Sequence, residues 1–400
     1  MLHALKEASN DKILFASMNN EFSYQFLDKI FEKIKGSGGT SDGLIYSPFS
    51  IFYIMQLVYM GSSGETRQEL GRVLGHDVDN AQSESEIIKN MIQVGHEMTA
   101  SNVFKIANGF FLEKSYNELI KENYRKLMDM IGQIEGCDFQ GNASQEVLKI
   151  NSWVKEKTNG LIPQILSVED ISCLTKLILV NTIYFKASWK YPFKKSATQD
   201  QEFINMAGGG KIVPMMTLEE RLPFFEDNRI QILSMPYKNK LFAMDFFLPK
   251  RRGRLGMTEL VEKMSSKNYY CVKSILKTDV EVYLPRFTQR YNNSLNELFQ
   301  DCGANKMFSA GSAEFENMIT PPVGSAGYLY ISNIIHGAVV IVDEEGTEAA
   351  AATAIMYDEF CMADDYVPVF RADHPFLYQI RYLPKNLVLF QGIFDGESSA

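Results

Sequence analysis

The stretch that decides the fold runs from Tyr330 to Cys361 and reads YISNIIHGAVVIVDEEGTEAAAATAIMYDEFC. Its first part is rich in isoleucine and valine, a composition typical of a β-strand. The alanine-rich part after Gly346 has high helix propensity, which is an unusual continuation for a strand. The last part mixes acidic and aromatic residues and is typical of an exposed loop. The stretch therefore predicts a buried strand, then a run of small residues, then an exposed tip.

The composition limits the class of protein. The chain has 400 residues, of which 46% are hydrophobic and 22% charged, and this is ordinary for a globular protein with a large core. The net charge of −9 disfavours a general nucleic-acid binder, because such proteins present a basic surface to phosphate. No run of about 18 or more apolar residues occurs, so we expect no membrane span.

The start of the chain and its cysteines bear on its compartment. Residues 1–22 lack a continuous apolar core and carry acidic residues early, so they make a poor secretory signal. We expect a cytoplasmic protein, or one released unconventionally to the extracellular space. The five cysteines are widely spaced without a CxxC pair, which favours free thiols and gives no sign of a metal site. We expect no cofactor. The N-glycosylation sequons at Asn142 and Asn292 are of a kind that often arises by chance, so they do not indicate the compartment.

The pattern along the chain predicts one α+β domain over residues 1–400. Helical patterns dominate the first 170 residues, for example at Phe22–Gly36, and Ser47 before Pro48 predicts a capped helix start. Strand patterns dominate the rest, beginning with the nearly unbroken apolar run Lys176–Trp189. No linker separates the two parts, and no repeat occurs.

Signatures of an enzyme are missing from the sequence. HExxH and GxxxxGK[ST] do not occur, and the one GxSxG match, at residues 39–43, lies in a glycine-rich loop and not at a strand-to-helix elbow. A catalytic triad through His336 stays open, although a histidine in an apolar strand is more often a core residue. Acidic neighbours should raise the pKa of the Cys361 thiol, which disfavours a nucleophile. The basic run Lys250–Arg254 is interpreted as a solvated turn. We therefore expect that the chain is not an enzyme.

Further motifs occur in a fixed order around the quoted stretch: IYSPFSI, INSWVKEKTNGLIPQIL, NTIYFKASWKYPF, VPMM, VYLPRF, FRADHPFLYQI and LVLFQGIF. Together they resemble the serpins, a family of protease inhibitors, over about Phe22–Phe394. The start without a clear signal resembles the ovalbumin-like, intracellular-type branch. The resemblance implies a helix-rich N-terminal part, a large central mixed sheet with two smaller sheets, and an exposed reactive loop at residues 344–369.

The resemblance also implies a mechanism, that of a one-use suicide substrate with a metastable fold. A serine protease attacks the exposed loop and is acylated. The cut loop then inserts as a new strand into the central sheet and traps the acyl-enzyme, a conformational change that releases stored strain. The implied reactive bond is Phe360–Cys361. A large aromatic favours a chymotrypsin-like target, and Tyr357, Met356 or Cys361 stay open as the bait if the register of the loop differs or if the target is elastase-like.

The implied hinge has the composition that insertion requires. Strand side chains alternate between faces, and an inward charge would oppose insertion through its desolvation cost. With Thr347 as the first inserted residue, the inward side chains are all small and uncharged. The hinge comprises Glu344, Glu345, Gly346, the inward set Thr347, Ala349, Ala351 and Thr353, and the outward set Glu348, Ala350 and Ala352.

Two further sites are implied by the resemblance. A polar cluster that gates the sheet, the shutter, comprises Ser47, Ser50, Asn181 and His336, and Trp189 marks the breach where insertion begins. Glu344 is expected to anchor the hinge by a salt bridge to a lysine. We expect a monomer whose partner is a serine protease, with no nucleic acid and no glycosaminoglycan.

Other functions stay open at this point. A non-inhibitory member of the family would act as a chaperone, store or carrier, and its loop would merely be exposed. A cysteine protease is an alternative target. A hydrolase using His336 would need an adjacent nucleophile in a pocket.

Overall fold

The computed structural model describes residues 2–36, 44–76, 81–101, 103–266, 275–321, 329–347 and 367–398. They form two compact units, each assembled from three segments of the chain. The first unit contains Met1–Ile30, Tyr46–Tyr184 and Tyr291–Val339, and the second contains Phe31–Ile45, Phe185–Arg290 and Val340–Ala400. Four β-strands continue from one unit's residues into the other's: β1 (Leu44–Tyr46), β4 (Leu177–Phe185), β11 (Phe287–Ser294) and β12 (Ile331–Val342).

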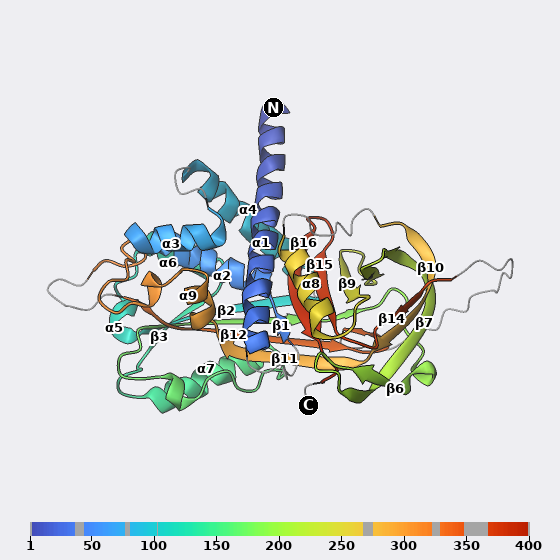
Figure 1. The fold of residues 1–400 in the computed structure, drawn as a ribbon. Helices are drawn as coiled ribbons and strands as arrows, with labels where there is room; N and C mark the ends of the chain where they lie inside the picture. Colours follow the sequence, from blue (N-terminus) through green and yellow to red (C-terminus); the bar gives the residue numbers. More distant parts are fainter. Residues whose placement is uncertain are drawn as a thin grey trace. The chain divides into compact units, whose positions relative to one another are not determined.

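The first unit holds most of the helices (Figure 1). They are α1 (Leu2–Gly36, which ends in the second unit), α2 (Pro48–Gly61), α3 (Gly64–Leu74), α4 (Ala81–Thr99), α5 (Lys114–Asn117), α6 (Glu122–Asp129), α7 (Ala143–Lys157) and α9 (Asn296–Asp301). The predicted start of α2 is confirmed, because Ser47 Oγ accepts the Ser50 N–H at 3.1 Å and Pro48 opens the first turn. No helix in the described ranges is long and apolar enough to cross a membrane.

Strands β2 (Phe104–Glu113) and β3 (Gln133–Cys137) complete the first unit, within the part where the sequence favours helices. The strand order is β3-β2-β4-β12. The β2–β3 and β4–β12 pairs are both parallel. In the second pair, Asn181 lies directly opposite His336. This register brings together two polar residues that are 155 positions apart.

The second unit is mostly β-structure. Its strands are β1 (Leu44–Tyr46), β5 (Ala187–Ser188), β6 (Gln199–Ile204), β7 (Gly210–Glu226), β8 (Ile230–Pro236), β9 (Phe242–Pro249), β10 (Lys277–Pro285), β11 (Phe287–Ser294), β13 (Gly346–Thr347), β14 (Val369–Arg371), β15 (Phe376–Tyr382) and β16 (Leu387–Phe394), with one helix, α8 (Gly253–Ser265). Strands β1-β16-β15-β9-β8-β7-β10-β14 follow one another in hydrogen-bonding order, with β6 beside β7. The chain combines helices with mixed sheets that contain both parallel and antiparallel strand pairs, so the predicted α+β class is confirmed.

The predicted strand Lys176–Trp189 is interrupted. Strand β4 ends at Phe185, and the chain resumes as β5 at Ala187. The two pieces have different partners, because β4 pairs with β12 whereas β5 pairs with β13. A change of neighbouring strand along an apolar run leaves no signal in the sequence, so the pattern predicts a single strand.

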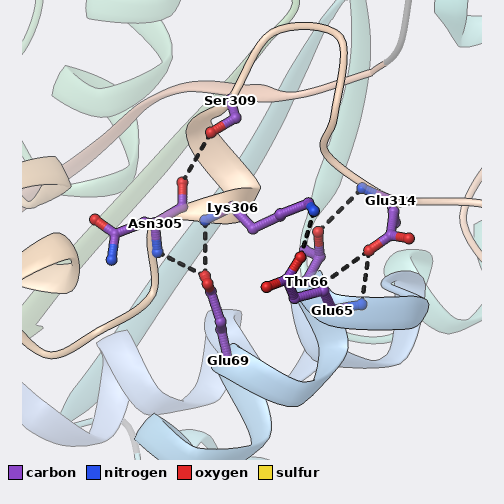
Figure 2. Close-up of polar contacts among 7 residues, drawn as sticks. All are labelled: Glu65, Thr66, Glu69, Asn305, Lys306, Ser309 and Glu314. Carbon is purple, nitrogen blue, oxygen red and sulfur yellow. Dashed lines mark hydrogen bonds and ion pairs between the residues drawn. The ribbon is translucent and has the colours of Figure 1, made fainter.

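In the first unit, helix α3 and the segment from Asn305 to Glu314 cap each other (Figure 2). The Glu314 carboxylate accepts the backbone N–H groups of Glu65 at 2.6 Å and Thr66 at 3.2 Å, at the start of α3. Glu69 in turn accepts the N–H groups of Asn305 and Lys306 at 2.8 and 2.7 Å. Carboxylates at these positions satisfy N–H groups that a helical turn leaves without an intrahelical partner.

Candidate functional site

The start of the predicted hinge is part of a sheet in the second unit. Strand β13 pairs with the end of β12 on one side (Val342 opposite Thr347) and with β5 on the other (Thr347 opposite Ala187). Thr347 is fully buried, and its hydroxyl lies 2.7 Å from the Tyr237 hydroxyl. Burial raises the pKa of Tyr237, which keeps this phenol protonated. The first residue of the expected insertion therefore already occupies a strand position.

Gly346 is required by close packing. A Cβ atom at this position would lie 2.2 Å from the Ala187 carbonyl oxygen. No side chain tolerates a backbone atom at that distance, so only glycine lets β13 approach β5. The structure thus gives a packing reason for the glycine within the predicted hinge.

Trp189, the predicted breach residue, holds the segment just before β13. Its indole N–H donates to the Asp343 carbonyl at 2.9 Å, and its backbone N–H donates to the Glu345 carbonyl at 2.9 Å. Its ring stacks on Tyr237 with centroids 4.6 Å apart. Trp189 and Thr347 therefore contact the same tyrosine, a residue that the sequence analysis did not select.

Glu344 is buried, with 3% of its surface exposed. Its carboxylate accepts a hydrogen bond from Thr198 Oγ1 at 2.7 Å and lies 3.3 Å from Arg286 Nη1. The expected lysine partner is therefore replaced by an arginine, whose planar guanidinium is less strongly hydrated than an ammonium and suits a half-buried pair. A lysine does pair with the next residue, since Lys195 Nζ lies 2.5 Å from Glu345.

The four predicted shutter residues, which are all fully buried, lie together in the first unit. Asn181 Oδ1 accepts hydrogen bonds from the Ser50 hydroxyl and from His336 Nδ1, the latter at 2.7 Å. His336 Nε2 accepts the Ser47 N–H at 3.0 Å. These contacts join the start of α2 to β4 and β12.

The sequence analysis missed one member of this cluster, Asn108. Its Oδ1 accepts from Asn181 Nδ2 at 2.6 Å, and it is buried in β2. An asparagine inside the apolar strand Phe104–Glu113 was the available signal, because a buried amide needs a partner.

His336 is a neutral core residue in this arrangement. An Nε2 that accepts a backbone N–H carries no proton, so the proton is on Nδ1. Burial lowers the pKa of His336 to about 3. Since Ser47 N–H and Asn181 occupy both ring nitrogens, no ring nitrogen is left to activate a serine hydroxyl. The geometry therefore disfavours the hydrolase alternative.

Strands β4 and β12 pair directly with each other. Backbone register partners run from Leu177 opposite Ile331 to Tyr184 opposite Val339. No third strand separates β4 and β12 over these described residues, so insertion does not extend between them. The predicted reactive bond Phe360–Cys361 and the hinge residues Glu348–Thr353 lie outside the described part of the chain.

The basic run Lys250–Arg254 has acidic partners. Lys250 pairs with Glu226, Arg251 Nη1 lies 2.6 Å from Glu259, and Arg252 Nη2 lies 2.7 Å from Asp373. These pairs are consistent with a solvated turn.

The fold and these sites can now be compared with known proteins. A family model described as "Serpin (serine protease inhibitor)" matches residues 17–395. The chain belongs to the serpin family. A leukocyte elastase inhibitor of Xenopus tropicalis is 32% identical, with 92% of this chain and 96% of that protein covered. An uncharacterized serpin-like protein of Thermococcus kodakarensis is 31% identical over 90% of this chain and 82% of its own length.

Solved serpin structures share the fold. Native protease nexin-1 with heparin matches with a TM-score of 0.81 at 24% identity, over 95% of this chain and 99% of that one. A serpin of Arabidopsis in its native stressed conformation matches with a TM-score of 0.78 at 26% identity, over 96% and 98% of the two chains. The family model and the leukocyte elastase inhibitor of Xenopus tropicalis support inhibition of serine proteases by this serpin.

The comparisons correct one sequence-based statement and leave another without support. The prediction that the chain is not an enzyme is corrected, because the family model assigns the chain to the protease inhibitors. The positive assignment as an inhibitor replaces it. An extracellular location receives no support from the relatives.

Proposed function

We propose that this serpin inhibits serine proteases as a one-use suicide substrate. The observation that carries the proposal is the position of Thr347, a small uncharged residue that pairs with β12 and β5 at the start of the loop. Strands β4 and β12 are still directly paired. This is the arrangement expected before cleavage, with the first strand position filled and the rest of the insertion still to come.

The proposed bait is the bond Phe360–Cys361, and the proposed target is a chymotrypsin-like or elastase-like protease. The aromatic residue supports the first target class, since a deep apolar slot accepts it. The printed name of the Xenopus relative, a leukocyte elastase inhibitor, supports the second. Asp358 and Glu359 add negative charge beside the bait, which favours proteases with basic residues near the substrate groove.

The other predicted sites have proposed roles in the same mechanism. Trp189 and the hinge from Glu344 to Thr353 guide the cleaved loop as it enters the sheet. The shutter keeps β4 paired with β12 until the loop enters. We also propose that residues 1–400 act as a single domain and as a monomer, with the reactive loop at residues 344–369. Continuous strands that contribute residues to both compact units support the single-domain proposal.

The test is incubation with chymotrypsin and, separately, with elastase. Denaturing gels detect a covalent complex, and mass spectrometry identifies the released C-terminal peptide. We expect a complex that survives SDS and a peptide that begins at Cys361. A peptide that begins elsewhere would move the bait but keep the mechanism.

Phe360→Arg is the matched variant for target choice. It should lose inhibition of chymotrypsin and gain complex formation with trypsin, because only the residue in the primary pocket has changed. Cleavage of the wild-type loop by every protease tested, with no complex and full protease activity, would contradict suicide inhibition.

A further inference from the structure

A row of buried polar side chains crosses one sheet of the second unit. Ser234 on β8 lies opposite Asp245 on β9, Asp245 lies opposite Gln379 on β15, and Gln379 lies opposite Gln391 on β16. Directly opposite residues share a face of the sheet. All four are at most 6% exposed, in strands that are otherwise largely apolar. Neither the reactive loop nor the shutter uses this row.

The charge in the row is neutralised within the sheet. Arg381 Nε donates to Asp245 Oδ2, and Arg381 Nη1 donates to Asn386 Oδ1. Arg381 is only 4% exposed. Because the carboxylate and the guanidinium already balance each other, a further ion at this position would be buried without a counter-charge. Any occupant should therefore be neutral.

Within the row, Asp245 and Gln379 each have one side-chain atom with no hydrogen-bond partner among the described residues, and the chemistry of these two atoms is complementary. They are Asp245 Oδ1, which can only accept, and Gln379 Nε2, which can only donate. They belong to directly opposite residues, whose Cβ atoms lie roughly 5 Å apart in an antiparallel pair. A group that both donates and accepts would satisfy both atoms at once.

We propose that this row is a binding site for an internal water molecule between β9 and β15. The water donates one hydrogen to Asp245 Oδ1 and accepts one from Gln379 Nε2. Ser234 and Gln391 in the same row offer further polar atoms, and buried waters typically make about three hydrogen bonds. Water is the smallest neutral molecule with both functions, and it keeps a buried carboxylate oxygen solvated inside a sheet.

The first test counts long-lived internal waters in solution by oxygen-17 magnetic relaxation dispersion. Gln379→Leu removes the donor and should reduce the count by at least one. Leu377→Met changes a fully buried apolar residue on the same face of β15 and should leave the count unchanged. Gln379→Asn keeps an amide and leaves more room, so the count should stay the same or rise, and this variant keeps the test valid if Gln379→Leu fails to fold.

A high-resolution crystal structure supplies the second readout. We expect density for one water within about 3 Å of both Asp245 Oδ1 and Gln379 Nε2. A direct hydrogen bond between these two atoms, density for a larger molecule, or an unchanged water count in folded Gln379→Leu would overturn the proposal. The site lies on the opposite face of β9 from Met244, whose sulfur contacts Tyr237 at 3.6 Å. The outcome is therefore independent of the inhibition assay.

Discussion

Acidification should destabilise the folded serpin through His336. In the unfolded chain a histidine has a pKa of about 6.5, whereas burial lowers the pKa of folded His336 to about 3. Between these two values the unfolded state binds a proton that the folded state does not. The free energy of unfolding therefore falls as pH decreases from about 6.5 to about 3, and the stabilisation is fully present above pH 6.5.

The magnitude follows from the same values. At about pH 5 the unfolded histidine is roughly 1.5 units below its pKa, and each unit is worth about 1.36 kcal/mol. His336 should thus remove about 2 kcal/mol of stability relative to pH 7.5. The structural reason is that Nε2 accepts the Ser47 N–H, so a proton on Nε2 would place two donors face to face.

His76 adds a contribution of similar size. Burial, and to a smaller extent the charge of Arg67, lowers the pKa of His76 to about 4. Its pH window therefore overlaps that of His336, between about 4 and 6.5. Wild-type protein alone cannot separate the two residues, so the assay needs a variant of each.

The assay is urea unfolding at about pH 7.5 and pH 5, followed by tryptophan fluorescence, in wild type, His336→Gln and His76→Gln. Each variant should lose about 2 kcal/mol less stability on acidification than wild type does. The comparison concerns the change with pH, so a general loss of stability in a variant does not affect it. An equal acid-induced loss in wild type and His336→Gln would refute the reasoning.

Three further predictions concern the hinge and the α3 cap. Thr347→Arg would bury a charge at the first inserted position, so the protein should be cleaved as a substrate, with at least a roughly tenfold higher stoichiometry of inhibition; an unchanged stoichiometry would contradict this. Arg286→Met leaves the buried Glu344 without its cation and should lower the free energy of unfolding by about 1–2 kcal/mol; this value is modest because Arg286 is half exposed. Thermal unfolding measures the effect, and an unchanged melting temperature would argue against a stabilising pair. Glu314→Gln removes the charge at the start of α3 and should lower the free energy of unfolding by about 1 kcal/mol in urea, with Glu118→Gln, at an exposed position away from the start of α3, as the control.

The resemblance to the serpins implied the polar cluster, and the local chemistry of its residues agrees with that prediction. Asn181 and His336 are polar residues in strongly apolar strands, and buried polar groups need partners. The two strands are parallel neighbours, and the register places these residues opposite each other. The start of the helix after Ser47 could also be predicted, because serine followed by proline is typical of a capped helix N-terminus.

The rest depends on tertiary placement, which a single sequence does not encode locally. Arg286, between β10 and β11, becomes the partner of Glu344 although the two are 58 residues apart. The row through Asp245 and Gln379 appears only when the register of four strands is known. In the sequence each of these residues is one polar side chain in an apolar run, which is also compatible with a strand edge or an exposed face.

The sheet geometry suggests where the proposed insertion is resisted. Before insertion, β12 shares one ladder of hydrogen bonds with β4. A strand entering between them would make two ladders, so the final state gains backbone hydrogen bonds, but the existing ladder must open first. The bond from His336 to Asn181 crosses that ladder, and Asn181 is also tied to Ser50 and Asn108. Opening would therefore expose several buried polar groups together, and we propose that this cost makes the polar cluster, rather than the apolar pairs beside it, the barrier to entry.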